Sequence, residues 1–261
     1  MVRLTIDGKE LSAKPDQTIL EIARENGIYI PTLCYHYRLS LLKSCRICLV
    51  DVEGAEMPMA SCATPVVDGM VVRTRTERVE KMRLEALKLL LVNHPLDCPV
   101  CDAGGECQLQ NRTYEFGIEK NEFPAEKREI PPTPYGTPLI RQWFDRCVMC
   151  LRCVQACLDV PGADVLEVAE HGFSSYVKAV RKENCISCGE CLHVCPVGAL
   201  TENLSRVKGR TWQLSRVQTT CTFCPCGCQV ELNTLARKKV VEKNTKTCLW
   251  AGLRFCGEGG T

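Results

Sequence analysis

Two runs of the sequence share the cysteine spacing C-x2-C-x2-C-x3-C. CVMCLRCVQAC begins at Cys147, and CISCGECLHVC begins 38 residues later at Cys185. In such runs three thiolates of a tight loop bind one cubane, and the fourth reaches the other cluster of the pair. The repeat therefore predicts two [4Fe–4S] clusters. Their expected ligand sets are Cys147, Cys150, Cys153 and Cys195 for the first, and Cys157, Cys185, Cys188 and Cys191 for the second.

Zinc is the alternative interpretation of this repeat. Tetrahedral zinc also uses C-x2-C pairs, but two complete four-cysteine runs favour iron–sulfur. The proline usual after the last cysteine is present as Pro196, whereas Leu158 follows Cys157. The second run thus has the usual ending, and the first departs from it slightly.

A different spacing, C-x10-C-x2-C-x13-C, occurs near the start of the chain. It is formed by Cys34, Cys45, Cys48 and Cys62. A long loop with an internal C-x2-C is typical of plant-type [2Fe–2S] sites, although the C-x4-C-x2-C spacing of those sites is absent. The pattern predicts a [2Fe–2S] cluster, with zinc or free buried cysteines as alternatives. His36 is expected to be a loop side chain or a hydrogen-bond donor rather than a ligand.

A third pattern, H-x3-C-x2-C-x5-C, combines His94 with Cys98, Cys101 and Cys107. A cubane needs four ligands, and only three cysteines lie nearby, so the spacing favours His94 as the fourth. A satisfied surface or core histidine is the alternative. An imidazole in place of a thiolate removes negative charge, which tends to raise the reduction potential.

The elements that must position these residues are short, and together they predict an α+β chain of small iron–sulfur domains. In residues 1–75, VRLTI and KELSA flank the turn pair Asp7-Gly8, which indicates a hairpin. ILEIAREN predicts a helix capped by Asp16 or Thr18 and followed by Gly27. CLVDVEG predicts another strand. The expected unit is a β-grasp, [2Fe–2S] ferredoxin-like domain.

The remaining boundaries follow from composition and from the repeat. Residues 76–117 combine a helix, with Val79, Met82, Ala86 and Leu90 on one face, and the His94 site. Residues 118–139 contain five prolines and predict an extended linker. Residues 140–212 hold the repeat, with a hairpin expected in DVLEVAEHGFSSYVKAV. Residues 213–261 contain two further strands, QVELNTL and KKVVEK, in a small β-rich domain.

The overall composition agrees with metal binding. The chain has 261 residues, 21 cysteines and a formal net charge of +2. This mixed balance gives no reason to expect nucleic acid or an anionic membrane as a partner. No leader and no apolar run of about 20 residues are visible, so we expect no membrane insertion and a cytoplasmic location. In a reducing compartment, this many cysteines are expected to bind metal rather than to form disulfides.

The order of the sites resembles a known family. This order is similar to that in the iron–sulfur half of the large subunit of NAD-dependent formate dehydrogenases. It consists of the [2Fe–2S] pattern, then NHPLDCPVC, then the two ferredoxin-type runs, then CTFCPCGC. The first three units also resemble the N-terminal region of [FeFe]-hydrogenases, and the large iron–sulfur subunit of complex I is a further relative. The resemblance implies that His94, Cys98, Cys101 and Cys107 together hold a [4Fe–4S] cluster.

The C-terminal motif resembles the start of the catalytic domain of molybdopterin oxidoreductases. Cys221, Cys224 and Cys228 fit its C-x2-C-x3-C triplet, and Cys256 fits its fourth ligand, which implies a further [4Fe–4S] cluster. Cys226 and Cys248 are left over. On spacing alone a zinc ribbon is the alternative. Glu258 replaces the lysine of that family, and the sequence ends at Thr261 without a pterin-binding region.

These features predict an electron-relay subunit, with one [2Fe–2S] and four [4Fe–4S] clusters, no molybdopterin, no flavin and no catalytic residue of its own. The resemblance implies a flavin subunit that binds NAD(P)H, a further redox subunit and, as a candidate, a thioredoxin-like [2Fe–2S] subunit. The complex would be a formate dehydrogenase, a hydrogenase or a bifurcating transhydrogenase. The alternatives are the cluster-bearing part of a split molybdenum, tungsten or hydrogen-activating enzyme, and a zinc-stabilised scaffold.

Overall fold

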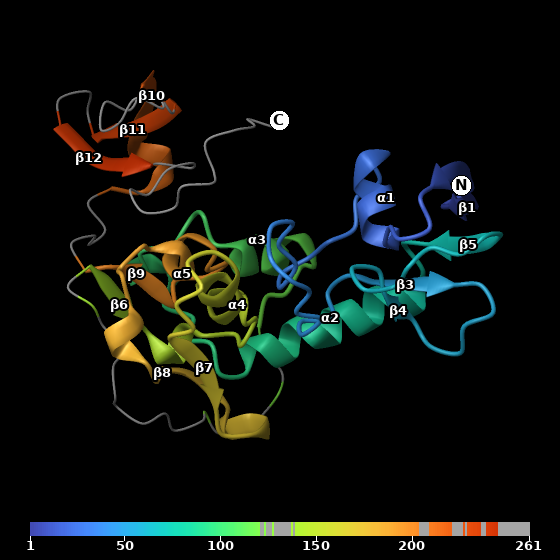
Figure 1. Cartoon of the computed structure of the whole chain (residues 1–261), viewed down its shortest axis with the longest axis horizontal. Coiled ribbons are helices and arrows are strands. Elements are labelled where there is room, and N and C mark those ends of the chain that lie inside the picture. The colour runs from blue at the N-terminus through green and yellow to red at the C-terminus, as the bar shows by residue number, and fades with distance from the viewer. Residues whose placement is uncertain are drawn as a thin grey trace. The chain divides into compact units, whose positions relative to one another are not determined.

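The computed structural model forms two compact units. It describes residues 1–120, 123, 127, 137, 139–203, 209–220, 227, 229–235 and 239–244. The first unit comprises Met1–Pro95, Gln108–Glu129 and Cys147–Arg152, and the second comprises Leu96–Cys107, Ile130–Arg146 and Cys153–Thr261. Figure 1 labels the helices and strands of this α+β chain.

The first unit contains a mixed five-stranded sheet in the order β2-β1-β5-β3-β4. β1 and β5 are parallel, and the other neighbours are antiparallel. Its strands are β1 (Val2–Ile6), β2 (Lys9–Ala13), β3 (Leu49–Val52), β4 (Met59–Ala60) and β5 (Met70–Arg73). The predicted first hairpin is confirmed: Asp7 (φ 49°) and Gly8 (φ 81°) are both left-handed, as the tight turn between β1 and β2 requires.

Helix α1 (Ile19–Glu25) packs its apolar residues into the core of this sheet. Thr18, rather than Asp16, is the N-cap. Its hydroxyl accepts the Glu21 N–H at 3.3 Å, and the Glu21 carboxylate accepts the Thr18 N–H at 2.7 Å, which completes a capping box. Gly27 (φ 70°) follows the C-cap Asn26, as the sequence predicts. The cap thereby fixes the direction in which the chain leaves α1 toward Cys34.

Removing this cap is expected to loosen α1. Thr18→Ala should lower the free energy of local opening of the helix by about 1 kcal/mol, because it leaves a backbone N–H of the first turn without its acceptor. Amide hydrogen exchange at Ile22 and Ala23 measures this change. Ser12→Ala, at an exposed position of β2, is the matched control and should leave that exchange unaltered. Equal exchange in both variants would contradict the role of the cap.

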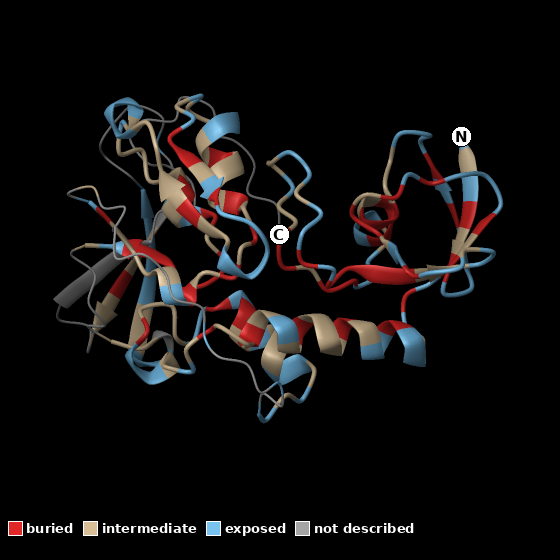
Figure 2. Cartoon of the chain, turned by 90° about the horizontal axis from the view of Figure 1, so that it is seen from below, coloured by how far each residue is buried: buried red, intermediate tan, exposed pale blue. Residues whose placement is uncertain are grey.

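Helix α2 (Glu77–Leu91) has Thr76 as its N-cap and lies within the predicted range, but its buried face differs from the prediction. The buried residues are spaced by four: Val79, Arg83, Leu87 and Leu91. In Figure 2, buried segments in red alternate with tan and pale blue ones along the long helix. Of the predicted face only Val79 is fully buried, and Met82, Ala86 and Leu90 are half-buried. The predicted face was chosen from apolar residues alone and so did not include Arg83, which is buried.

The other helices are short. In the described residues they are η1 (Cys98–Val100), α3 (Gln108–Glu115), η2 (Phe144–Arg146), α4 (Arg152–Asp159), η3 (Gly172–Ser174), η4 (Lys182–Asn184), α5 (Glu190–His193) and η5 (Thr211–Gln213). No helix in the described part of the chain is both long and apolar enough to cross a membrane.

Three small antiparallel sheets belong to the second unit. β6 (Ile140–Gln142) pairs with β9 (Leu200–Glu202). β7 (Leu166–Ala169) pairs with β8 (Tyr176–Ala179), which confirms the hairpin predicted within the cysteine repeat. β11 (Gln229–Leu235) and β12 (Lys239–Asn244) are the predicted strand pair, and β10 (Leu214–Thr220) adds a third strand that the sequence did not predict.

Candidate iron–sulfur sites

The four cysteines predicted to hold a [2Fe–2S] cluster all belong to the first unit and are all buried. Cys34, Cys45, Cys48 and Cys62 are each at most 7% exposed. Cys34 and Cys45 are held face to face, since the backbone N–H of each is directed at the sulfur of the other, at 3.3 and 3.5 Å. Cys48 and Cys62 belong to the apolar core of this unit. Two left-handed residues, Lys43 (φ 53°) and Arg46 (φ 58°), shape the loop between these cysteines.

Hydrogen bonds and electrostatic repulsion between the four thiols shift their pKa values. A hydrogen bond from Cys45 lowers the pKa of Cys34 to about 5, and a hydrogen bond from Cys62 lowers the pKa of Cys48 to about 6. The pKa values of the donating partners Cys45 and Cys62 are raised, first by those same bonds and then by burial. Burial and mutual repulsion thus disfavour four charged thiolates in the absence of a cation. A cationic iron core would offset that cost.

A buried arginine lies beside this site. Arg83 of α2 is 3% exposed and donates through Nε to the Leu49 carbonyl at 3.1 Å, with a second bond from Nη2. Burial lowers its pKa, and the adjacent Cys48 thiol opposes that change. Sequence reasoning missed Arg83, which lies four residues after Val79 on the buried face of α2. It places a fixed positive charge next to the [2Fe–2S] loop.

A second buried arginine joins two predicted ligand loops. Arg152, which lies between Cys150 and Cys153 in the sequence, is 4% exposed. Its Nε donates to the Cys34 carbonyl at 3.3 Å, and its Nη2 donates to the Tyr35 carbonyl at 2.8 Å. In the opposite direction, the Ser44 hydroxyl donates to the Cys150 carbonyl at 3.4 Å. The loop of the first ferredoxin run therefore packs directly on the [2Fe–2S] loop.

The two ferredoxin runs share a backbone conformation as well as a spacing. Met149 (φ 51°) and Leu151 (φ 63°) are left-handed on either side of Cys150, and Ser187 (φ 54°) and Gly189 (φ 79°) are left-handed on either side of Cys188. Three of these are not glycine, and for such residues a positive φ costs free energy. The same strained turn in both runs bends each loop around its middle cysteine.

The second ferredoxin-type set gathers at one cavity of the second unit. Cys157, Cys185, Cys188 and Cys191 all line this small cavity, together with apolar residues such as Ile140 and Val165. Burial, followed by repulsion from the other three thiols, raises the pKa of Cys191 to about 12. The donor set and its apolar wall fit a [4Fe–4S] cluster, whose iron would offset the cost of buried thiolates.

Two further predicted ligand sets, the first ferredoxin-type set and the set that contains His94, are each divided between the two units. Cys147 and Cys150 belong to the first unit, and Cys153 and Cys195 to the second. His94, which is 8% exposed, belongs to the first unit, whereas Cys98, Cys101 and Cys107 belong to the second. Both ligand sets therefore stay predictions. The C-terminal candidates Cys221, Cys224, Cys228 and Cys256 lie outside the described residues, and so do the left-over Cys226 and Cys248.

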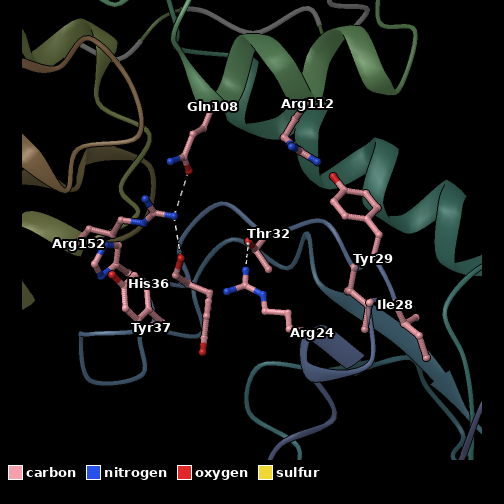
Figure 3. Close-up of a pocket in the computed structure, with 12 residues that line it drawn as sticks. Arg24, Ile28, Tyr29, Thr32, His36, Tyr37, Gln108, Arg112 and Arg152 are labelled. Atoms are coloured by element: carbon pink, nitrogen blue, oxygen red, sulfur yellow. Dashed lines mark hydrogen bonds between the residues drawn. The ribbon is translucent and has the colours of Figure 1, made fainter. Parts of the chain in front are cut away.

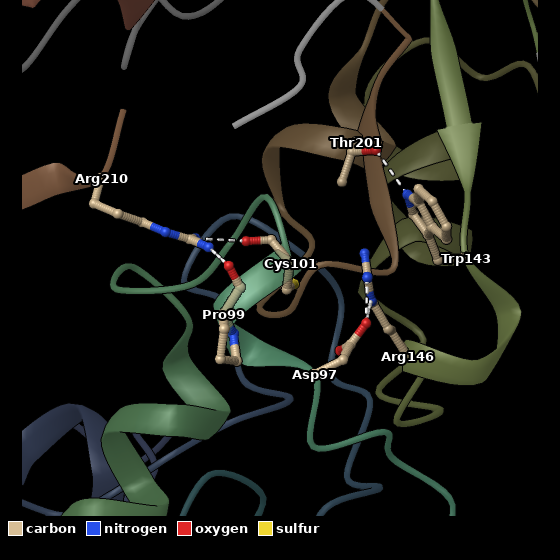
Figure 4. A network of polar contacts seen from close by, with 7 residues as sticks. All are labelled: Asp97, Pro99, Cys101, Trp143, Arg146, Thr201 and Arg210. Carbon is tan, nitrogen blue, oxygen red and sulfur yellow. Dashed lines mark hydrogen bonds and ion pairs between the residues drawn. The ribbon is translucent and has the colours of Figure 1, made fainter. Parts of the chain in front are cut away.

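The loop that carries Cys98 and Cys101 is tightly braced within its own unit. Arg210 donates to the backbone carbonyls of Cys101, at 2.8 Å, and of Pro99 (Figure 4). A Cβ on Gly104 would lie 2.4 Å from the Cys98 carbonyl oxygen, and a Cβ on Gly198 would lie 2.4 Å from the Cys101 sulfur. Only glycine fits at these two positions, so the backbone closes around the thiols.

A polar network continues from this loop. Arg146, 4% exposed, forms an ion pair with Asp97, the residue before Cys98, and lies 4.4 Å from the centre of the Trp143 ring. The Trp143 indole N–H donates to the Thr201 hydroxyl at 3.0 Å (Figure 4). Buried or hydrogen-bonded arginines thus lie beside the Cys98–Cys101 loop, as they do beside the [2Fe–2S] loop. The cysteine spacing did not predict them.

Within the described ranges, no three His, Cys, Asp or Glu side chains converge closely enough to hold a single metal ion. The ligands of an iron–sulfur cluster bind different iron atoms and do not have to meet at one point.

Comparison with protein families matches three segments. Residues 1–77 match a 2Fe-2S iron-sulfur cluster binding domain, residues 83–122 match the NADH-ubiquinone oxidoreductase-G iron-sulfur binding region, and residues 137–201 match the ferredoxin-like domain of NADH-quinone oxidoreductase subunit 3. The chain is therefore a series of 2Fe-2S ferredoxin-like, 4Fe-4S-binding and ferredoxin-like segments, and clusters of both kinds are its cofactors.

Several characterised proteins are similar over most of the chain. The NADPH-Fe(3+) oxidoreductase subunit alpha of Geobacter sulfurreducens is 42% identical over 90% of this chain and 28% of its own length. An NADH-quinone oxidoreductase subunit of Rhizobium meliloti is 42% identical over 91% of this chain and 28% of its own length. The chain thus spans less than a third of these two relatives.

One solved structure is also similar. A chain of an NAD+-reducing [NiFe]-hydrogenase in the H2-reduced state superposes with a TM-score of 0.71 and 29% sequence identity. The match covers 80% of this chain and 90% of that chain. The chain is thus similar to proteins with more than one activity.

Proposed function

We propose that this chain, which is similar to the iron–sulfur region of NADH-quinone oxidoreductases, is an electron-transfer subunit of a cytoplasmic, NAD(P)H-linked complex. It relays single electrons between a flavin subunit and another redox module. The observation that carries the proposal is the direct packing of two predicted ligand loops, through Arg152 on the Cys34 carbonyl and Ser44 on the Cys150 carbonyl. Such packing gives two adjacent sites for one-electron carriers.

The proposed ligand sets are those expected from the sequence. Iron–sulfur clusters bound there would supply one-electron oxidation and reduction. The chain's own residues bury the thiols, as at Cys34 and Cys48, and exclude water from them. Arg83 and Arg152 supply positive charge and fix backbone carbonyls beside the ligands. A β-grasp fold for residues 1–75 and a small C-terminal [4Fe–4S] domain belong to the same proposal.

The imidazole of His94 is proposed as the fourth ligand of the Cys98, Cys101 and Cys107 site. His94→Ala should remove or alter one [4Fe–4S] signal and leave the others in place, because only that cluster loses a ligand. Electron paramagnetic resonance of the dithionite-reduced chain measures this change. His171→Ala, at an exposed position, is the control. A spectrum identical to that of the unaltered chain would contradict the assignment.

The proposed partners are a flavoprotein that oxidises or reduces NAD(P)H and a second redox subunit, with a thioredoxin-like [2Fe–2S] subunit as a further candidate. A hydrogenase partner is favoured by the similarity to an NAD+-reducing [NiFe]-hydrogenase chain. A formate dehydrogenase or a bifurcating transhydrogenase would use the same relay. Tagging this chain and identifying the proteins that copurify with it distinguishes these complexes.

A second candidate is the cluster-bearing part of a split molybdenum- or tungsten-containing enzyme. The CTFCPCGC motif that begins at Cys221 favours it. Molybdenum or tungsten in stoichiometric amount in the purified complex would support this second function, and the absence of both metals would reject it.

The relay is tested in the purified complex under anaerobic conditions. Addition of NADH or NADPH should bleach the visible absorption of the clusters, and an electron acceptor should restore it. Persistent absorption after reduced nicotinamide is added, in a complex whose flavin is reduced, would contradict the relay.

A further inference from the structure

The first unit contains a cavity of about 580 Å³ that none of the predicted cluster ligands lines. This volume lies within the range of small-molecule sites, roughly 300–1,000 Å³. Its wall is built by the end of α1, the segment that follows it, α3 and Arg152, all within the first unit. Figure 3 shows these side chains around an open centre.

The wall of this cavity is positively charged. Arg24, Arg112 and Arg152 line it, and none of the described lining residues is acidic. Glu115, which is not among the lining residues, accepts from Arg112 and from the Tyr29 hydroxyl at 3.0 Å. Guanidinium groups stay charged at every physiological pH and match the geometry of phosphate oxygens. The charge therefore selects an anion.

The arginines are held in position before any ligand arrives. Arg24 lies 4.6 Å from the centre of the Tyr35 ring and donates to the Thr32 hydroxyl at 3.2 Å. Arg152 is fixed by the Tyr35 carbonyl and by Gln108, at 2.8 and 3.1 Å. In Figure 3 the guanidinium groups of Arg24 and Arg152 approach the same open space from different elements. Two ordered cations on one cavity suit a ligand with more than one negative charge.

An aromatic ring borders the same space. Tyr29 is 51% exposed, and the Arg112 guanidinium lies 5.6 Å from its ring centre. Any of the nucleobases can stack on an exposed tyrosine, because every base has an aromatic face. The wall thus combines sites for phosphate and for a planar ring.

We propose that this cavity binds a nucleoside diphosphate, with its phosphates on Arg24, within the field of the buried charge of Arg152, and its base against Tyr29. The binding requires no electron transfer, so its failure would leave the proposed function untouched.

Equilibrium dialysis of the cluster-loaded full chain tests the proposal with labelled ADP and labelled pyrophosphate. We expect one ADP per chain. Arg24→Gln should weaken both ligands about tenfold or more, because a charge-assisted hydrogen bond is lost. Tyr29→Ala should weaken ADP at least about fivefold and leave pyrophosphate unchanged, because only the base loses its platform. Arg73→Gln, an exposed arginine of β5 outside the cavity, is the matched control.

Three results would overturn the proposal. One is no binding of ADP at millimolar concentration. Another is equal ADP affinity in Arg24→Gln and Arg73→Gln. The third is binding of a polyglutamate peptide without binding of ADP, which would assign the cavity to an acidic partner protein.

Discussion

Arg152→Met is expected to damage the [2Fe–2S] site although Arg152 is not a ligand. The substitution keeps most of the side-chain volume but removes the donors to the Cys34 and Tyr35 carbonyls. Each buried carbonyl left without a partner costs about 1–3 kcal/mol, so the loss for the two carbonyls is on the order of 2–6 kcal/mol. We expect the [2Fe–2S] signal of the reduced chain to weaken or broaden and to disappear at a lower temperature.

Thermal loss of that signal, followed by electron paramagnetic resonance, measures the effect. Arg75→Met, at an exposed position, removes the same charge without a buried partner and should behave like the unaltered chain. If Arg152→Met retained the full signal and its thermal resistance, the packing of the two ligand loops would not be what holds Cys34 in place.

Arg83→Met is expected to lower the reduction potential of the [2Fe–2S] cluster. Reduction adds negative charge, and the buried guanidinium beside Cys48 stabilises that charge. Its removal should shift the potential downward, on the order of tens of millivolts. It should also lower stability by about 1–3 kcal/mol, because the Leu49 carbonyl loses its donor.

A redox titration of two variants separates the effect of the Arg83 charge on the potential from the effect of its hydrogen bonds. Arg83→Lys keeps the cation but not the two-pronged geometry. It should therefore lose stability while holding a potential close to that of the unaltered chain. Equal downward shifts in the lysine and methionine variants would show that the carbonyl contact, and not the charge, sets the potential.

Local patterns in the sequence were enough to predict much of the fold. The Asp7-Gly8 turn and the Thr18 cap each depend on a few adjacent residues, and so does the β7–β8 hairpin. The three-segment family match agrees with the order of cysteine motifs. Such features are readable because propensity and capping act within one or two turns of chain.

The arginines around the thiols could not be predicted in this way. Arg152 finds its carbonyl partner on Cys34, 118 residues away in sequence, and Arg210 contacts a carbonyl on Cys101, 109 residues away. Only the folded chain brings such partners together. Arg83 was missed for another reason, since helical periodicity alone does not decide which neighbouring stripe is buried or whether it includes a charge.

Iron, acid-labile sulfide and zinc in the anaerobically purified full chain provide the most direct test of the central claim. We predict iron and sulfide in nearly equal amounts, about eighteen of each per chain for one [2Fe–2S] and four [4Fe–4S] clusters. Zinc in place of iron, without sulfide, would contradict the account.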